Sequence, residues 1–374
     1  MPTDVPLAGV ELRLLRLPLA EPFGAAHATR LARPIVLVRA LVAEGPDGWG
    51  ECVAEAEPSY WPEYSDGAWH VLEHHLVPRL LGGRSLEEVR GHQMAKAALR
   101  CAVIDAGLRA EGRSMAAFLG AVRAQVATGI ALGITPSLDD LVAAAERWHG
   151  EGHRSFKLKV RPGWDVEPVA AVRKALGEAV ALLVDANGAF RSDDPDDVAG
   201  LERLAEPDLG LAAIEQPFPP DDLVGHARLA ERLAASPTAV CLDESIGSLG
   251  DLETALALGA CDAVSLKAGR VGGPVEAGRI HHRCVDEAIA VRCGGMLETG
   301  VGRALNLAIA ALPGCTLPPD LGPSHRYFAE DVTVPFDASS GNMKVPQGPG
   351  LGVEPRADMI DRTTERSLLI QAPR

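Results

Sequence analysis

From residue 125 onward, short apolar runs alternate with longer stretches of helical periodicity. The runs are rich in aliphatic residues and lack strict apolar–polar alternation, which is typical of parallel strands covered on their outer face. Eight such units predict a closed β/α barrel rather than an open sheet. In chain order the runs are VATGIALG, FKLKV, LLVDAN, LAAIEQP, AVCLDES, AVSLKAG, IAVRCGGM and a weaker CTLPPD at 315–320.

The first part of the chain has a different pattern. Three apolar or alternating segments separated by turn residues predict a small antiparallel sheet, at 9–19, 34–42 and 48–54. Two longer segments predict helices, at 59–82 and 85–111. This order of elements favours an α+β domain that precedes the barrel.

Three regions follow from these patterns. We expect an α+β capping domain over residues 1–123 and the β/α barrel over residues 124–320. The tail, residues 321–374, is rich in Pro and Gly, and we expect it to leave the barrel and pack back on the capping domain.

Composition narrows the class of protein. The net charge of −15 disfavours nucleic acid or an anionic membrane surface as a partner. The seven cysteines are odd in number and scattered without CxxC spacing, which is typical of reduced thiols in a cytoplasm. With no apolar run long enough for a membrane span, we expect a soluble, cytoplasmic protein.

One barrel strand carries two lysines. In FKLKV, Lys157 and Lys159 are two residues apart, so their side chains point to the same face of the strand. Mutual repulsion and burial both lower a lysine pKa, toward a value useful for a base. The alternative is an edge strand with a solvated lysine face.

Charged residues recur at the ends of the predicted strands. Successive members are 24 to 30 residues apart, about one β/α unit, and they are Lys159, Asp185, Glu215, Asp243 and Lys267. Strand ends at this spacing meet at the C-terminal mouth of a barrel, where barrel enzymes build their active sites.

The three carboxylates predict a metal site. Asp185, Glu215 and Asp243 repel one another unless a cation lies among them. Oxygen-only ligands suit Mg²⁺, for which Mn²⁺ can substitute, and the absence of histidine or cysteine from the set disfavours zinc. The alternative is that each carboxylate caps the helix that follows it.

The two outer lysines suggest a reaction. Lys159 and Lys267 lie four strands apart, so they face each other across the mouth. A substrate carboxylate held by the cation would place its α-carbon between two amines. We therefore expect chemistry that begins with removal of a proton α to a carboxylate, with the cation stabilising the resulting enolate.

These residues together resemble the enolase superfamily, and within it the o-succinylbenzoate synthase / N-succinylamino acid racemase family. The resemblance covers nearly the whole chain. The matching motifs are GWGECVAEAEPSYWPEY, GHQMAKAALRCAVID, KLKV, VDANGAF, IEQPF, CLDES, LKAGRVGG and CGGMLETGVGRALN.

The resemblance implies a modified (β/α)8 barrel, (β/α)7β, with an N-terminal α+β capping domain. It implies that Lys159 is the acid/base, that the neighbouring charge of Lys157 makes it a better base, and that Lys267 is the opposing lysine. It also implies a small carboxylate substrate and a homo-oligomer. The carboxylates at 185, 215 and 243 would hold Mg²⁺.

The resemblance also suggests substrate contacts, at Asn187, Tyr60, Arg270, Gly294, Gly295 and Met296. In the family an arginine at the position of Arg270 is associated with racemase competence; the alternative is a surface arginine. The chain departs from the family pattern at four places around the substrate pocket, namely the 23–30 loop, Ala131, Ala268 and Arg292.

We therefore expect a lyase of the enolase superfamily. Its first candidate activity is that of an o-succinylbenzoate synthase, which dehydrates 2-succinyl-6-hydroxy-2,4-cyclohexadiene-1-carboxylate in menaquinone biosynthesis. The alternative is an N-succinylamino acid (N-acylamino acid) racemase, alone or as a second activity. More distant alternatives are a dipeptide epimerase or cycloisomerase, a metal-free aldolase in which Lys267 forms a Schiff base, and a non-catalytic binding barrel.

Overall fold

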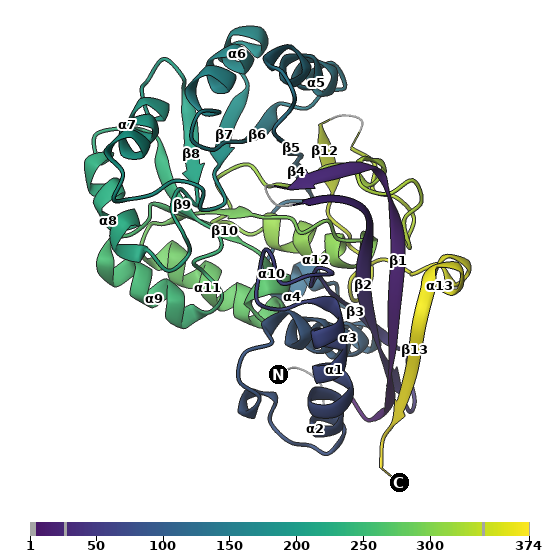
Figure 1. The fold of residues 1–374 in the computed structure, drawn as a ribbon. Coiled ribbons are helices and arrows are strands. Elements are labelled where there is room, and N and C mark those ends of the chain that lie inside the picture. Colours follow the sequence, from purple (N-terminus) through teal and green to yellow (C-terminus); the bar gives the residue numbers. More distant parts are fainter. Residues whose placement is uncertain (1–4, 26–27, 339–340, 374) are drawn as a thin grey trace.

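The N-terminal sheet of the capping domain is built from both ends of the chain. The computed structural model describes residues 5–25, 28–338 and 341–373. Four antiparallel strands pair in the order β13-β1-β2-β3. Their bounds are β1 (Leu7–Ala25), β2 (Ala28–Val42), β3 (Gly48–Cys52) and β13 (Thr364–Gln371). Figure 1 shows β13 alongside β1 at the edge of the sheet.

Helices cover one face of this sheet. The longest is α3 (Gln93–Glu111), which packs directly on β3. A Cβ added at Gly50 would lie 2.0 Å from the Ala98 carbonyl oxygen, so the contact requires glycine in the strand. The other helical segments of this part are α1 (Ser65–Val71), η1 (Leu72–Leu76), α2 (Val77–Leu81), η2 (Leu86–Glu88) and α4 (Met115–Leu119).

Seven parallel strands form the barrel, in the order β11-β10-β9-β8-β7-β6-β5. Each is short and almost fully buried, as expected for strands covered on both sides. Their bounds are β5 (Ile130–Leu132), β6 (Ser155–Lys159), β7 (Ala181–Asp185), β8 (Leu211–Glu215), β9 (Ala239–Leu242), β10 (Ala263–Leu266) and β11 (Ala290–Cys293).

Helices follow the strands and form the outer layer of the barrel (Figure 1). Their bounds are α5 (Leu138–Gly150), α6 (Val166–Leu176), α7 (Pro195–Leu204), α8 (Leu223–Arg232), α9 (Leu249–Leu258), α10 (Ala268–Val271), α11 (Pro274–Asp286) and α12 (Gly300–Ala310). The remaining elements are β4 (Gln125–Ala127), η3 (Ser324–Arg326), β12 (Asn342–Lys344) and α13 (Ala357–Thr363). None of the helices within the described ranges is long and apolar enough to cross a membrane.

The predicted eighth strand, CTLPPD, is not a regular strand. It forms an isolated parallel bridge between Cys315 and Val291, and Asp320 donates its backbone N–H to the Cys293 carbonyl at 2.8 Å. Two consecutive prolines, Pro318 and Pro319, lack the N–H groups that a strand ladder needs. On the other side of this segment, the Gly129 N–H donates to the Leu321 carbonyl at 3.3 Å, beside β5. The prediction of an enolase-type barrel with a capping domain is confirmed.

Candidate active site

Three carboxylates meet at the C-terminal mouth of the barrel. Asp185 and Glu215 are the last residues of β7 and β8, and Asp243 directly follows β9. One oxygen of each lies within 4.8 Å of the others, and all three side chains are buried. We call Asp185, Glu215 and Asp243 the carboxylate triad.

Cationic side chains pair with every member of the triad. The Lys157 ammonium contacts Asp185 at 2.9 Å and Glu215 at 3.0 Å, and Lys159 contacts Asp185 at 2.7 Å. Lys267 contacts Asp243 at 2.6 Å. Lys157 and Lys159 come from β6 and Lys267 follows β10, so the barrel brings together charges from distant parts of the chain.

The pKa values of the triad reflect these pairs. Burial alone would raise the pKa of Asp185 and of Asp243, but Lys157 with Lys159, and Arg270 with Lys267, hold these two pKa values well below the ordinary range. Burial raises the pKa of Glu215 despite its cationic neighbours. Asp185 and Asp243 are therefore anionic at neutral pH.

The triad is chemically suited to a hard divalent cation. It offers only carboxylate oxygens, they are buried and close together, and they come from three rigid strand ends. Neither histidine nor cysteine joins this cluster among the residues that the structure describes. The residues present thus fit Mg²⁺ or Mn²⁺.

Lys159 and Lys267 flank the triad on opposite sides. Lys159 lies at the Asp185 end and also donates to the Asn187 side-chain oxygen at 2.6 Å. Lys267 lies at the Asp243 end. Since β6 and β10 are four strands apart in the sheet, the two amines approach the space above the triad from different directions.

The predicted lowering of the pKa of the strand lysines is wrong for Lys157. Burial lowers the pKa of Lys157, but contacts with Asp185, Asp320 and Glu215 outweigh burial and raise it well above the ordinary lysine value. The prediction considered only the repulsion between the two lysines of one strand, whereas the carboxylates that contact Lys157 come from other parts of the chain. Lys157 is therefore a fixed cation.

Arg270 and Tyr60 hold the Lys267 side of the site. Arg270 is fully buried and pairs with Asp243, which excludes the surface alternative. The Tyr60 hydroxyl accepts hydrogen bonds from Lys267 at 2.7 Å and from Arg270 at 2.8 Å. Burial first, and then the charge of Asp243, raise the pKa of Tyr60 well above its ordinary value, so the hydroxyl stays protonated.

Asn187 connects the two sides of the triad. Its side-chain amide donates to Glu244 at 2.7 Å, while its oxygen accepts from Lys159. Its backbone has a φ of 45°, in the left-handed region that Asn tolerates better than most residues. Burial raises the pKa of Glu244 to about 7. Asn187 thus orients an amine and a carboxyl group at once.

The 294–296 segment brings backbone close to the side chain of Lys267, the residue after β10. A Cβ at Gly294 would lie 2.7 Å from Cε of Lys267, and one at Gly295 would lie 2.6 Å from the Asp320 carbonyl oxygen. Met296 is buried with the core of the capping domain, and its carbonyl accepts from Arg33 at 3.0 Å. Gly294 and Gly295 lie at the site, whereas Met296 joins the cap to the barrel.

Two charged residues next to the triad were missing from the predicted site. Asp320 contacts Lys157 at 2.7 Å, and Arg292, singled out only as unusual for the family, pairs with Glu215. Asp320 ends the CTLPPD segment, so the rule of charges at strand ends would have found it. The side chains of the 23–30 loop lie outside the described residues.

The comparisons with known proteins agree with this geometry. A family model described as Enolase C-terminal domain-like matches residues 140–359. The chain is 46% identical over 373 residues to an N-succinylamino acid racemase from an Amycolatopsis species, which covers 97% of this chain and 99% of that relative. It is 39% identical to the o-succinylbenzoate synthase of Geobacillus kaustophilus, over 95% of each chain. The chain belongs to the enolase superfamily, in the o-succinylbenzoate synthase and N-succinylamino acid racemase family.

A solved structure of the same superfamily has the same fold. The enolase-superfamily protein from Listeria innocua superposes with a TM-score of 0.92 at 33% identity, covering 99% of this chain and all of that one. In this superfamily a buried triad such as Asp185, Glu215 and Asp243 is typical of a divalent metal site.

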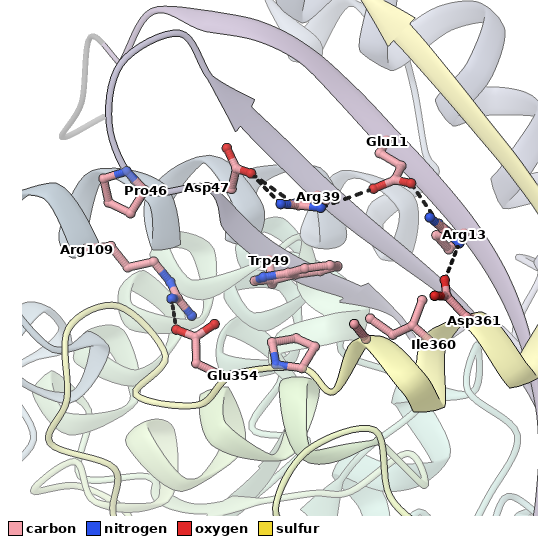
Figure 2. A pocket seen from close by; sticks show the side chains of 12 residues that line it. Glu11, Arg13, Arg39, Pro46, Asp47, Trp49, Arg109, Glu354, Ile360 and Asp361 are labelled. Atoms are coloured by element: carbon pink, nitrogen blue, oxygen red, sulfur yellow. Dashed lines mark hydrogen bonds and ion pairs between the residues drawn. The ribbon is translucent and has the colours of Figure 1, made fainter.

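A surface pocket of about 450 Å³ lies away from this site, on the capping sheet (Figure 2). In it Arg39 lies over the ring of Trp49 and pairs with Asp47 at 2.7 Å. Arg109 pairs with Glu354 across the pocket. None of its lining residues comes from a barrel strand, so the pocket is separate from the candidate active site.

Proposed function

We propose that this chain is an N-succinylamino acid racemase that depends on Mg²⁺ or Mn²⁺. The observation that carries the proposal is the placement of two amines, Lys159 and Lys267, on opposite flanks of one carboxylate triad. Racemisation needs an acid/base on each face of the α-carbon, whereas dehydration needs mainly one. The 46% identity to a racemase supports the same choice.

The proposed reaction consists of two proton transfers. The neutral amine of one lysine takes the α-proton of the N-succinylamino acid, and the C–H electron pair is delocalised into the substrate carboxylate. The ammonium of the opposite lysine then gives a proton to the other face, which yields the other enantiomer. A bound divalent cation supplies electrostatic stabilisation of the charge that develops on the carboxylate.

The other side chains would prepare these transfers. Asn187 and Asp185 would orient Lys159 through the hydrogen bonds described above. Tyr60 and Asp243 would orient Lys267, and buried Arg270 would hold Asp243 in place. Asn187, Tyr60, Arg270, Gly294, Gly295 and Met296 stay proposals as substrate contacts.

The o-succinylbenzoate synthase reaction is the second candidate, because relatives with that activity are 39% and 38% identical to the chain. Here one lysine would take the α-proton and then give it to the departing hydroxide, which leaves as water. Lys159, which is about a quarter exposed, is the better placed of the two for this shuttle.

Exchange of the α-proton for deuterium tests the proposal. The purified protein with Mg²⁺ should exchange the α-proton of both enantiomers of N-succinyl-phenylalanine, which proton NMR measures. It should also racemise each enantiomer, which polarimetry measures. Lys159→Ala and Lys267→Ala should each lose exchange of a different enantiomer, by at least about a hundredfold. EDTA should abolish exchange, and added Mg²⁺ should restore it.

Lys174→Ala, on the exposed face of α6, is the matched control and should keep full exchange. Dehydration of the cyclohexadiene substrate is followed in parallel by absorbance. Dehydration at full rate without exchange of either enantiomer would make the chain a synthase alone. Full dehydration by Lys159→Ala would refute Lys159 as the base.

A further inference from the structure

A buried arginine reaches the carboxylate triad from the far side of the barrel. Arg292 lies on β11, in register with Ser265 of β10, and its side chain is 1% exposed. Its guanidinium donates from Nη1 to Oε2 of Glu215, and from Nε to the Pro318 carbonyl at 3.1 Å. Strands β11 and β8 are three positions apart in the sheet, so this contact crosses the barrel interior.

Glu215 is consequently held between two cations. Lys157 occupies its Oε1 at 3.0 Å, and Arg292 occupies its Oε2. A divalent cation that binds Glu215 must share the carboxylate with a guanidinium whose charge does not titrate. In a buried site, this repulsion is only weakly screened.

Asp320 acts in the opposite sense. It contacts Lys157 at 2.7 Å, so the positive charge of Lys157 is shared with a third carboxylate and acts less strongly on Asp185 and Glu215. It also lies within electrostatic reach of Arg292. Asp320 and Arg292 are thus two opposite charges that act on the triad through Lys157 and Glu215.

We propose that Arg292 lowers and Asp320 raises the affinity of the carboxylate triad for a divalent cation. The inference rests on the metal dependence in the proposed function. It concerns two positioning residues that act through Glu215 and Lys157. A purely structural role makes a different prediction, because loss of either residue would then disorder the triad and weaken binding in both variants.

Titration with Mn²⁺, followed by the electron paramagnetic resonance signal of the free ion, tests this without any substrate. Arg292→Met, neutral and of similar volume, should bind Mn²⁺ about tenfold more tightly than the unsubstituted protein. Asp320→Asn, which keeps the shape of the side chain, should bind about tenfold more weakly. Arg279→Met, an exposed arginine of α11, is the charge-matched control and should change the Kd less than twofold.

Should Arg292→Met not fold, Arg292→Gln is the second neutral variant, since its amide nitrogen takes the place of Nε, which donates to the Pro318 carbonyl; it too should tighten binding. Variants that both weaken binding, or both leave it unchanged, overturn this inference and leave the proposed function standing. An unsubstituted protein that binds no Mn²⁺ instead overturns the metal dependence of the proposed function.

Discussion

The backbone at Gly294 packs closely against the side chain of Lys267. We predict that Gly294→Ala displaces the amine of Lys267, because a Cβ there would lie 2.7 Å from Lys267 Cε and 2.7 Å from Ser265 Oγ. A displacement of about 1 Å is enough to lower α-proton exchange by about a hundredfold. Deuterium exchange by NMR measures the effect, and circular dichroism checks the fold.

Gly278→Ala is the matched control for this substitution. A Cβ at Gly278, in α11, meets only Leu119 at 3.9 Å, so exchange should be unchanged. Unchanged exchange in Gly294→Ala as well would show that Lys267 has room to move without loss of function.

We predict that His226 makes the stability of the fold depend on pH. Its Nδ1 donates to the Asp222 carbonyl at 2.7 Å, so Nε2 accepts from the Gln216 amide at 3.2 Å. Burial lowers the pKa of His226 below 6.5, so the unfolded chain binds this proton more readily. The free energy of unfolding should therefore fall as the pH drops below 6.5, by at most about 1.4 kcal/mol per pH unit.

Urea unfolding at pH 7 and pH 5.5 measures this slope. His226→Gln cannot titrate and should show a smaller fall between the two pH values. His74→Gln, on an exposed helical surface, controls for the loss of one histidine. An equal fall in His226→Gln and in the unsubstituted protein would assign the slope to other groups.

The spacing of charges along the sequence was enough to predict that the carboxylate triad meets at one end of the barrel. It was not enough to give the protonation of Lys157, which is decided by Asp185, Glu215 and Asp320 on other strands. Nor could spacing show that Arg292 crosses the barrel to Glu215, because β11 and β8 are not neighbours. Contacts between distant strands are set by closure of the barrel.

At the scale of elements, β3 and α3 pack backbone to backbone. We predict that Gly50→Ala forces them apart, because its Cβ would lie 2.0 Å from the Ala98 carbonyl oxygen and 2.9 Å from the Ala102 nitrogen. Overpacking of this kind costs about 1–3 kcal/mol, which urea unfolding measures. Gly250→Ala, where a Cβ meets only Ser248 Oγ at 3.6 Å, should cost nothing. Equal stabilities would mean that the cap tolerates the separation.

Periodicity predicted most of the barrel strands, but the last predicted strand is not a regular strand. CTLPPD has the apolar residues of a strand, yet Pro318 and Pro319 cannot donate to a ladder. The segment instead closes the barrel through separate backbone hydrogen bonds to Val291 and Cys293 of β11 on one side. On the other side, the carbonyl of the next residue, Leu321, accepts from Gly129. Composition indicates where a barrel segment lies, whereas hydrogen-bond capacity decides whether it is a strand.

At the scale of the whole molecule, the two ends of the chain share one sheet. Seven residues of β1 pair with β13, from Gly9 with Gln371 to Leu15 with Thr364. We predict that deletion of residues 364–374 leaves β1 with an open edge, so that the protein self-associates and unfolds at lower urea concentration. Size-exclusion chromatography and urea titration measure the two effects.

Deletion of residues 372–374 alone spares the strand and is the control for the longer deletion. A monodisperse protein with an unchanged midpoint after the longer deletion would show that β2 and β3 suffice for the cap.

This pairing also has a consequence for protein synthesis. The ribosome makes β1 before the barrel and β13 after it, so the two partners emerge on the order of tens of seconds apart at ordinary elongation rates. Throughout that interval one side of β1 has no neighbour. We therefore expect the nascent capping domain to expose a strand edge that a chaperone could cover, and slower translation to lengthen this exposure.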